Sequence, residues 1–245
     1  DDVFGAQSEE LVLTRLTAPT INVNGSQILW QDSQQGVSAY RLYLYKITND
    51  IEELINSNYI EYSGSNYSYN LTGLQAGEYK VKINALGDSE SSNEYNLTRH
   101  YIDSAISDSG NIEKLEKPTL LFDKNLSKFS VLNFDAQQNL NLQLNVYFNG
   151  QAIETIDLSQ TGSTTYSFDN AGTYKFNLVS KSTNGTQIDS DASAEIQVLK
   201  LGQISSISQG IDINGNYKID GLILNGANQF VVEKIFNNAK TTLQN

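Results

Sequence analysis

Few side chains in this sequence are of the types that perform chemistry. The 245 residues include no cysteine and one histidine, His100, which excludes thiolate catalysis, disulfides, and metal sites built from cysteines or several histidines. Neither a nucleophile nor an orienting acid stands beside His100, so the sequence gives no support to a hydrolytic triad. We expect His100 to be a solvent-facing residue at the end of a strand.

A stretch near the C-terminus has the spacing of acidic and amide side chains that begins a calcium loop. Asp212, Asn214 and Asn216 stand at loop positions one, three and five, but such a loop needs glycine at position six and a bidentate carboxylate at position twelve. The sequence has Tyr217 and Ile223 at those two positions. A strand hairpin explains the stretch better, and calcium binding is the alternative.

Carboxylates elsewhere could act in two ways. Glu52 and Glu53 are adjacent, but glycosidase chemistry needs a cleft that holds two opposed carboxylates, and nothing in the sequence predicts one. Acidic residues at the joints between repeated units could bind calcium and stiffen them, although solvated loop carboxylates are far commoner. These residues are Glu9, Glu10, Asp103, Asp108, Glu113 and Glu116. We therefore predict a protein that is not an enzyme, with no catalytic residue and no cofactor, and leave calcium between units open.

Tyrosines are the most promising binding residues, because the chain has 14 of them. Tyr43 and Tyr45 alternate with Leu42 and Leu44, which places the two tyrosines on the outer face of a sheet. Further tyrosines follow in the next expected strands, at Tyr59, Tyr62 and Tyr67. Such an aromatic platform can stack on a sugar ring or bury itself in a protein partner. The alternative is a cross-strand ladder that only stabilises the sheet.

Composition narrows the environment in which the chain works. The formal net charge is −12 and the sequence pI is about 4.4, which opposes non-specific binding to nucleic acid. No stretch is long and apolar enough to span a bilayer, and the first residues lack a signal-peptide pattern. The chain contains no methionine, so we expect a mature or excised segment. The absence of cysteine favours a bacterial surface origin.

The chain repeats itself. The pattern Leu-x-x-Pro occurs at Leu16–Pro19 and again at Leu115–Pro118, and Ala-Gly-x-Tyr-Lys occurs at 76–80 and at 171–175. Shifting the first unit by 190 positions brings Asn-Gly of the first unit onto Asn-Gly of a third one, which stops halfway. Repetition of this kind is the signature of a serial array of small domains.

These repeats predict five segments. They are the last strand of a preceding module at 1–16, a complete module at 17–101, a flexible linker at 102–114, a second complete module at 115–199 and a partial third module at 200–245. A half-module has no opposing sheet. We therefore expect the tail from about Gly202 to be disordered or swapped, unless another segment covers it.

Within each unit apolar residues alternate with period two, which predicts strands with one buried face. Asn-Gly pairs separate the runs, and they favour tight hairpin turns because both residues accept positive φ. One helix-like piece, Asp50–Ile55, is interpreted as the return strand of a hairpin. About seven short strands in 90 residues predict an all-β fold of β-sandwiches.

Specific residues of the first unit match a known family. They are the opening Leu-x-x-Pro, an Ile28-x-Trp30 strand, a Tyr40-x-Leu42-x-Leu44 strand and the run from Leu71 to Tyr79 and Val81. In these features the unit resembles fibronectin type III-like or related bacterial immunoglobulin-like modules. The resemblance covers most of the chain and implies tandem immunoglobulin-like β-sandwiches in an elongated array. It is specific for fold and leaves activity open.

The resemblance also implies roles for four core residues. Trp30 would be the buried core tryptophan, and Tyr79 the tyrosine whose hydroxyl closes a loop corner. In the second unit Phe134 is expected to take the place of Trp30, and Tyr174 that of Tyr79. The second unit has no clear equivalent of Leu74, so it departs from the pattern there.

The function predicted from these observations is mechanical. The chain is interpreted as a non-catalytic extracellular spacer or stalk of a bacterial, adhesin-like surface protein, whose partners are neighbouring modules of the same chain. The alternative is a recognition module that binds a glycan or a host or cell-surface protein through Tyr43 and Tyr45. A third possibility is an accessory module of a secreted carbohydrate-active enzyme. No nucleic-acid partner and no membrane insertion are predicted.

Overall fold

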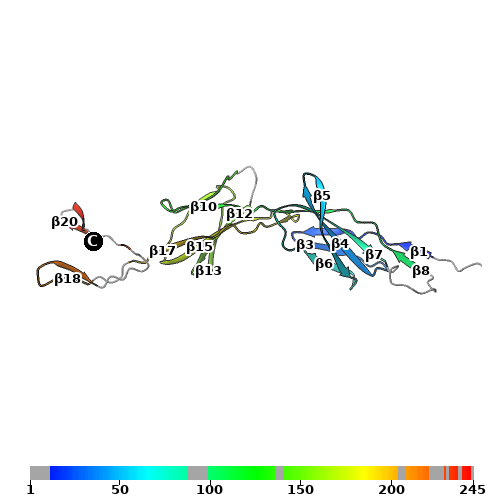
Figure 1. The fold of residues 1–245 in the computed structure, drawn as a ribbon, viewed down its shortest axis with the longest axis horizontal. Helices are drawn as coiled ribbons and strands as arrows, with labels where there is room; N and C mark the ends of the chain where they lie inside the picture. Colours follow the sequence, from blue (N-terminus) through cyan, green and yellow to red (C-terminus); the bar gives the residue numbers. More distant parts are fainter. Residues whose placement is uncertain are drawn as a thin grey trace, which may run out of the picture. The chain divides into compact units, whose positions relative to one another are not determined.

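The structure, a computed structural model, describes residues 12–87, 99–135, 141–203, 208–220, 229, 232–236 and 239–243. Every regular element within them is a β-strand, and the search for a helix able to cross a membrane finds none there (Figure 1). Contacts divide the chain into two compact units. The described part of the first consists of 12–87, 99–118, 141–142 and 179–192, and the remainder forms the second.

The first unit contains a sandwich of two sheets, here called the first sandwich. Its smaller sheet has the order β2-β3-β6, formed by β2 (Ile21–Asn24), β3 (Gln27–Gln31) and β6 (Asn66–Asn70). Its larger sheet has the order β16-β9-β7-β4-β5, formed by β4 (Ala39–Thr48), β5 (Ile51–Glu61), β7 (Gly77–Leu86), β9 (Gly110–Lys114) and the short β16 (Gln187–Ile188). Apart from the short β16, seven strands divided three and four between two sheets make an immunoglobulin-like sandwich.

The helix-like piece Asp50–Ile55 lies in the hairpin from β4 to β5. Asn49 and Asp50 both have positive φ, at 51° and 63°, as a two-residue primed turn requires, and β5 begins at Ile51. The equivalent turn in the second sandwich is Asn149-Gly150, with φ of 48° and 86°. The prediction of a return strand at Asp50–Ile55 is confirmed.

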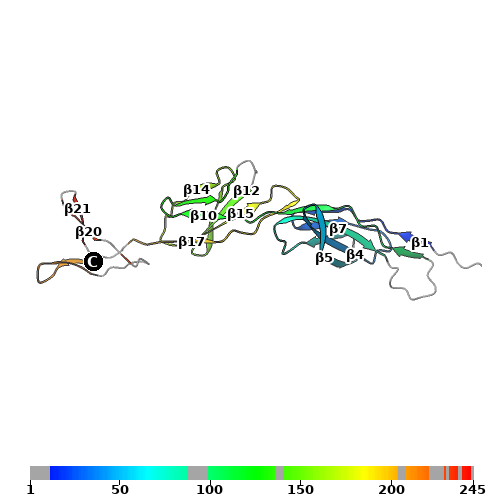
Figure 2. The same cartoon turned by 45° about the horizontal axis from the view of Figure 1, so that its top comes forward.

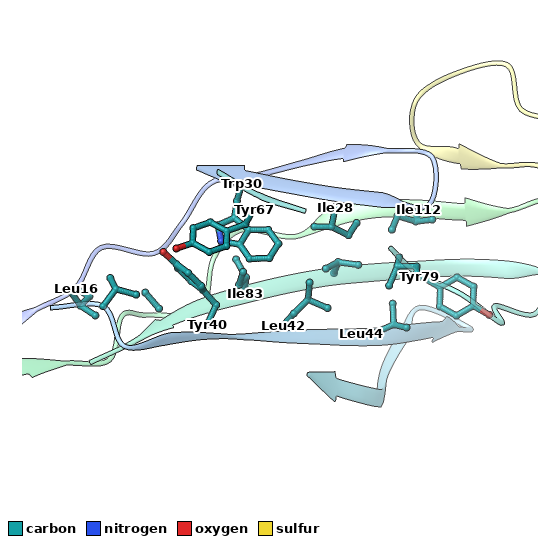
Figure 3. Close-up of a cluster of buried hydrophobic side chains, with 14 residues drawn as sticks. Leu16, Ile28, Trp30, Tyr40, Leu42, Leu44, Tyr67, Tyr79, Ile83 and Ile112 are labelled. Atoms are coloured by element: carbon teal, nitrogen blue, oxygen red, sulfur yellow. The ribbon is translucent and has the colours of Figure 1, made fainter. Parts of the chain in front are cut away.

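The core of the first sandwich lies between its two sheets (Figure 3). Alternate residues of β4 and β7 point inward, and Tyr40, Leu42 and Ile83 are fully buried. From the opposite sheet Trp30 stacks on Tyr67, with ring centroids 5.2 Å apart and planes within 9°. Burial of these aliphatic and aromatic side chains is the main stabilising contribution to a fold of this size.

The second sandwich repeats the strand order of the first (Figure 2). Its smaller sheet has the order β10-β11-β14, formed by β10 (Leu120–Asp123), β11 (Lys128–Val131) and β14 (Ser163–Thr165). Its larger sheet has the order β13-β12-β15-β17, formed by β12 (Asn141–Phe148), β13 (Gln151–Asp157), β15 (Gly172–Lys181) and β17 (Ile196–Lys200). Phe129 and Phe176 join the two sheets, with ring centroids 4.1 Å apart. The predicted all-β, immunoglobulin-like fold class is confirmed.

Tyrosine corners occur in both sandwiches. The Tyr79 hydroxyl donates to the carbonyl oxygen of Gln75 at 2.7 Å, which is the contact that the family resemblance implies. The Tyr174 hydroxyl donates to the carbonyl of Asn170 at 3.2 Å, four residues before it in both cases. Burial raises the pKa of Tyr79, so its hydroxyl keeps its proton and remains a donor.

Phe134 does not take the place of Trp30. In the first sandwich Trp30 pairs with Ile21, and the residue of β11 in the matching register is Val131, opposite Leu120. Phe134 follows the end of β11 and packs over Gly162, where an added Cβ would come within 2.2 Å of its ring. The buried aromatic ring of β11 is instead Phe129.

The segment predicted as a flexible linker, 102–114, is largely structured. Its last five residues form β9, which pairs antiparallel with β7 and closes the larger sheet of the first sandwich. Ser104 and Ser107 inside this segment are hydrogen-bonded to β7. The first sandwich therefore extends to Lys114, beyond the boundary predicted at residue 101.

Equivalent serine and aspartate side chains accept hydrogen bonds from backbone amides of β7 and β15 or of the residue that follows each strand. The amides of Ala85 and Ile83 donate to the hydroxyls of Ser104 and Ser107, and those of Ser180 and Leu178 donate to Ser190 and Ser193 in the same way, all at 2.9–3.0 Å. A carboxylate extends each set, because Asp103 accepts from the amide of Gly87 and Asp189 from that of Ser182. Side chains thus satisfy amides that a strand ladder would otherwise satisfy.

Strand β1 (Val12–Arg15) pairs in parallel with β8 (Arg99–Ile102). The residue that follows, Leu16, is 5% exposed and belongs to the core of the first sandwich. Residues 1–11 lie outside the described residues, so the expectation that 1–16 closes a preceding module remains a prediction.

The C-terminal part contains two hairpins. One is formed by β18 (Ser208–Ile211) and β19 (Tyr217–Asp220), the other by β20 (Val232–Phe236) and β21 (Ala239–Leu243). The first agrees with the hairpin expected around Asn214-Gly215, and Gly215 has φ of 79°. Much of the tail lies outside the described residues, so its predicted disorder or swapping remains a prediction.

Candidate functional site

The outer tyrosine face is the surface of the larger sheet of the first sandwich that points away from the core. Strand β4 places its side chains there between those of β7 and β5, because alternate residues of a strand share a face. The face is defined by Arg41, Tyr43 and Tyr45 on β4, Lys80 and Lys82 on β7, and Glu52, Leu54 and Tyr59 on β5.

Tyr43 and Tyr45 are both partly buried and lie side by side along β4. Their ring centroids are 6.5 Å apart, and the planes are inclined by 31°. The ammonium of Lys82 lies 5.0 Å from the centroid of the Tyr45 ring, within the range of a cation–π contact. The two predicted binding residues are thus adjacent, but one ring is already in contact with a cation.

A cross-strand ion-pair cluster covers the same surface. The two carboxylate oxygens of Glu52 accept from the ammonium groups of Lys80 at 2.8 Å and Lys82 at 2.6 Å. These hydrogen bonds lower the pKa of Glu52, so it is ionised at neutral pH. Glu52 therefore acts as a partner of lysines across the sheet.

Strand β5 carries the exposed apolar side chains next to this face. Tyr59 is 60% exposed opposite Arg41, and Leu54 is 51% exposed opposite Tyr45. Tyr67, which the sequence analysis grouped with the platform, is buried against Trp30 and is no part of it. Only Tyr43, Tyr45 and Tyr59 remain as aromatic residues of the face.

A hollow beside the face is polar. It has a volume of about 430 Å³ and is lined in part by Asp50, Glu78, Lys80 and Glu113. Three carboxylates against one ammonium give it a negative charge. Among the residues that the structure describes, no group of three or more histidine, cysteine or acidic side chains is arranged to hold a metal ion.

The other residues considered for catalysis or metal binding lie outside the outer tyrosine face. The backbone of His100 pairs with Leu13, and its side chain is outside the described residues. Asp212 accepts from the amides of Asn214 and Asn216 at 2.8 Å, which are the bonds of a turn. The amide of Asn216 and its side chain hold the pKa of Asp212 below its usual range.

The second sandwich has a partly different outer face. In the register set by the tyrosine corners, the serine contacts and the strand bulges, Asn145 stands where Tyr43 stands in the first sandwich, and Tyr147 stands where Tyr45 stands. Asn145 donates to the side-chain oxygen of Asn177 at 2.9 Å, in the place of Tyr43 and Lys82. Tyr43 is therefore not required by the fold.

A repeated motif that the sequence analysis missed could have located β9. The pattern Ile-Asp-Ser-x-x-Ser occurs at Ile102–Ser107 and at Ile188–Ser193. In both sandwiches the closing strand begins three residues after the last serine, at Gly110 and at Ile196. The strand itself gave little signal, because Ile112 is its only apolar residue apart from Gly110.

Comparison with known proteins adds likenesses of fold alone. No family model matches this sequence, and no curated protein matches it. The solved structures that it resembles include the FN1–FN3 domains of chicken CNTN1, with 12% identity and a TM-score of 0.32, where 78% of this chain and 66% of that chain are covered. This chain thus spans about two thirds of the length of that structure.

Two further structures give similar values. A two-domain fibronectin type III segment of chicken tenascin has 12% identity and a TM-score of 0.30, over 75% of this chain and 98% of that one. A cytokine receptor complex has 12% identity and a TM-score of 0.34, over 74% and 96%. The assignment of a fibronectin type III-like fold therefore rests on the strand order of the two sandwiches.

Proposed function

We propose that this chain is a non-catalytic spacer segment of an extracellular, bacterial surface protein. The proposal rests on one observation: the two sandwiches repeat the same framework, but they do not repeat the same outer surface in full. Both sandwiches share strand order, tyrosine corner and serine contacts, whereas the outer face differs where Asn145 and Asn177 replace Tyr43 and Lys82. A segment whose task is to hold other domains apart needs only the framework, because each sandwich resists extension by itself.

The charges of the outer tyrosine face also favour this role. Glu52 forms ion pairs with both Lys80 and Lys82 across the sheet, and Lys82 contacts Tyr45. These contacts are those of a cross-strand ladder that stabilises a sheet.

Force spectroscopy on single molecules tests the spacer role. Pulling the chain from its two ends should give two separate unfolding events, each releasing roughly 30 nm for about 90 residues. Destabilising one sandwich with Phe129→Ala should lower one event and leave the other at its original force. A chain that extends without such events would not serve as a mechanical spacer.

The second candidate is recognition of a glycan or a protein through the outer tyrosine face. It is favoured by the exposed Tyr59 and Leu54 beside Tyr43 and Tyr45. Binding on a glycan array that disappears in Tyr43→Ala and Tyr45→Ala would support it. The matched control is Tyr147→Ala, a partly buried tyrosine on β12 of the second sandwich. Absence of binding together with two unfolding events favours the spacer.

A further inference from the structure

Three strands occupy the same place in the repeat. Strands β1, β9 and β17 each end in a basic residue that is followed by leucine, at Arg15-Leu16, Lys114-Leu115 and Lys200-Leu201. Strands β9 and β17 are the closing strands of the two sandwiches, paired antiparallel with β7 and β15. The role of β1 can therefore be compared with theirs, register by register.

Strand β9 has partners on both of its edges. On one edge Ile112 lies opposite Tyr79 of β7 and is 2% exposed in the core. On the other edge β16 runs parallel to it, with Ile188 opposite Lys114, and the amide of Leu115 donates to the carbonyl of Ile188 at 3.1 Å.

Strand β1 has the same parallel pairing on one of its edges as β9 has with β16. It runs parallel to β8, with Ile102 opposite Arg15, and the amide of Leu16 donates to the carbonyl of Ile102 at 3.1 Å. Ile102 and Ile188 both begin the Ile-Asp-Ser-x-x-Ser motif, so the two parallel pairs are equivalent in sequence as well as in hydrogen bonding.

The other edge of β1 is where the two cases differ. In the described part of the chain the sheet that contains β1 has two strands, so no strand stands where β7 stands beside β9. Leu13 occupies the register position of Ile112, yet it is 59% exposed. An apolar side chain at a core position that is mostly exposed indicates a missing partner strand.

We propose that the free edge of β1 pairs antiparallel with the β7-type strand of a further sandwich, so that β1 is its seventh strand and Leu13 enters its core. The partner is specified by the pairing of β9: a strand with an aromatic residue opposite Leu13, as Tyr79 is opposite Ile112. Extended strand addition of this kind draws its affinity from main-chain hydrogen bonds and its specificity from alternate side chains. The inference goes beyond the spacer role, because it concerns strand pairing and holds equally for a recognition array.

A chain with an added sandwich tests the inference directly. A second copy of residues 17–109 is placed before Leu11 of the chain, replacing 1–10. This copy carries β2 to β7 of the first sandwich but neither β9 nor the short β16, and the junction preserves the spacing of the repeat. Backbone amide exchange at Val12–Arg15 should become slower by on the order of 100-fold or more relative to the 245-residue chain, because the strand becomes buried in a sheet.

Two controls keep the result interpretable. Leu13→Asn should abolish the protection in the extended chain, while leaving the melting of the 245-residue chain unchanged because Leu13 is exposed there. A second extended chain keeps β9 in the added copy by joining residues 17–115 directly to Thr17, which shows whether the added sandwich folds when closed by its own strand.

The inference is overturned if the copy closed by β9 folds and the copy closed by β1 does not. It is also overturned if amides of Val12–Arg15 are already protected in the 245-residue chain and sedimentation shows a dimer, because the edge would then pair with a second copy. Failure of the force experiment alone would remove the spacer role and leave the pairing of β1 untouched.

Discussion

The first sandwich packs Trp30 against Tyr67 and Tyr40, whereas the second packs Phe129 between Phe122 and Phe176. One core is built around an indole with phenols, and the other around phenylalanine rings. Yet the two have the same strand order and the same side-chain contacts to the long strand that carries the tyrosine corner. The fold tolerates different ring chemistry as long as aromatic volume fills the space between the sheets.

The outer faces differ more than the cores do. Tyr43 and Lys82 of the first sandwich correspond to Asn145 and Asn177 of the second, which are joined by an amide contact. Both sets of side chains cover equivalent parts of the two larger sheets. The comparison teaches that the tyrosine corner and the serine contacts maintain the sandwich, and that the surface residues are free to serve another purpose or none.

The largest expected effect comes from removing an aromatic ring of the core. Phe129→Ala should cost about 3–5 kcal/mol of unfolding free energy, because Phe129 is fully buried and its loss leaves a cavity. Trp30 is the only tryptophan, so its fluorescence follows the first sandwich. In denaturant the circular dichroism transition should split, with the fluorescence transition occurring later. The matched control is Leu121→Ala, which removes a 43% exposed side chain and should cost within about 0.5 kcal/mol.

Equal shifts of both transitions in Phe129→Ala would contradict the view that each sandwich has a core of its own. Two separate transitions would support this view, since one substitution would then have destabilised one core without the other. The same test with Trp30→Ala requires calorimetry, because that variant removes the fluorescent probe.

The serine contacts should give the next largest effect. Ser104→Ala and Ser190→Ala each leave a buried amide, of Ala85 or Ser180, without its side-chain acceptor. Each should cost about 1–3 kcal/mol in chemical denaturation, and the two costs should agree within error. Ser109→Ala, at an exposed serine, is the control and should change little. A cost in only one sandwich would break the equivalence of the two frameworks.

The tyrosine corners offer a finer comparison. Tyr79→Phe removes one hydrogen bond of 2.7 Å, whereas Tyr174→Phe removes a hydroxyl that contacts both the amide and the carbonyl of Asn170 at 3.2 Å. We expect each variant to lose about 0.5–1.5 kcal/mol, measured by urea unfolding at neutral pH. If neither variant changes the stability, the corner is a consequence of the loop and not a cause of its shape.

Much of this fold was predictable because its signals are local. Alternation along β4 identifies the buried leucines, and the spacing from Ala76 to Tyr79 marks a corner whose bond spans four residues. Turn residues such as Asn149-Gly150 locate hairpins through their tolerance of positive φ. These features depend on neighbours along the chain, and a single sequence contains them.

The remainder depends on contacts between distant segments. Strand β9 has one aliphatic residue and polar neighbours, so pairing with β7 defines it and periodicity does not. Phe134 was expected in a strand because of its type, but Val131 has the register of Trp30. For the candidate site, alternation placed Tyr43 and Tyr45 on the outer face. The ion pairs from Glu52 to Lys80 and Lys82 join strands about 30 residues apart, and no local pattern indicates them.

The smallest expected difference between the sandwiches is one of pH dependence. Asp189 accepts from the amide of Ser182 and from the ammonium of Lys181, while in the first sandwich Asp103 accepts from the amide of Gly87 and Leu86 stands in place of the lysine. Burial by itself would raise the pKa of Asp189, but the bonds from Lys181 and Ser182 outweigh it and hold the pKa below its usual range.

A carboxylate whose pKa is lower in the folded than in the unfolded state stabilises the fold above its unfolded pKa of about 4, and this contribution disappears as the pH falls through the folded pKa. Asp189→Asn should therefore destabilise the chain at pH 7, and the difference from the original sequence should shrink as urea unfolding is repeated at successively lower pH below about 4. Asp103→Asn is the matched control, because it removes an amide acceptor without removing a lysine partner. A difference for Asp189→Asn that stays constant down to low pH would show that the amide contact alone matters. The charge on Lys181 would then be unnecessary for stability, as in the first sandwich, where Leu86 occupies the equivalent position.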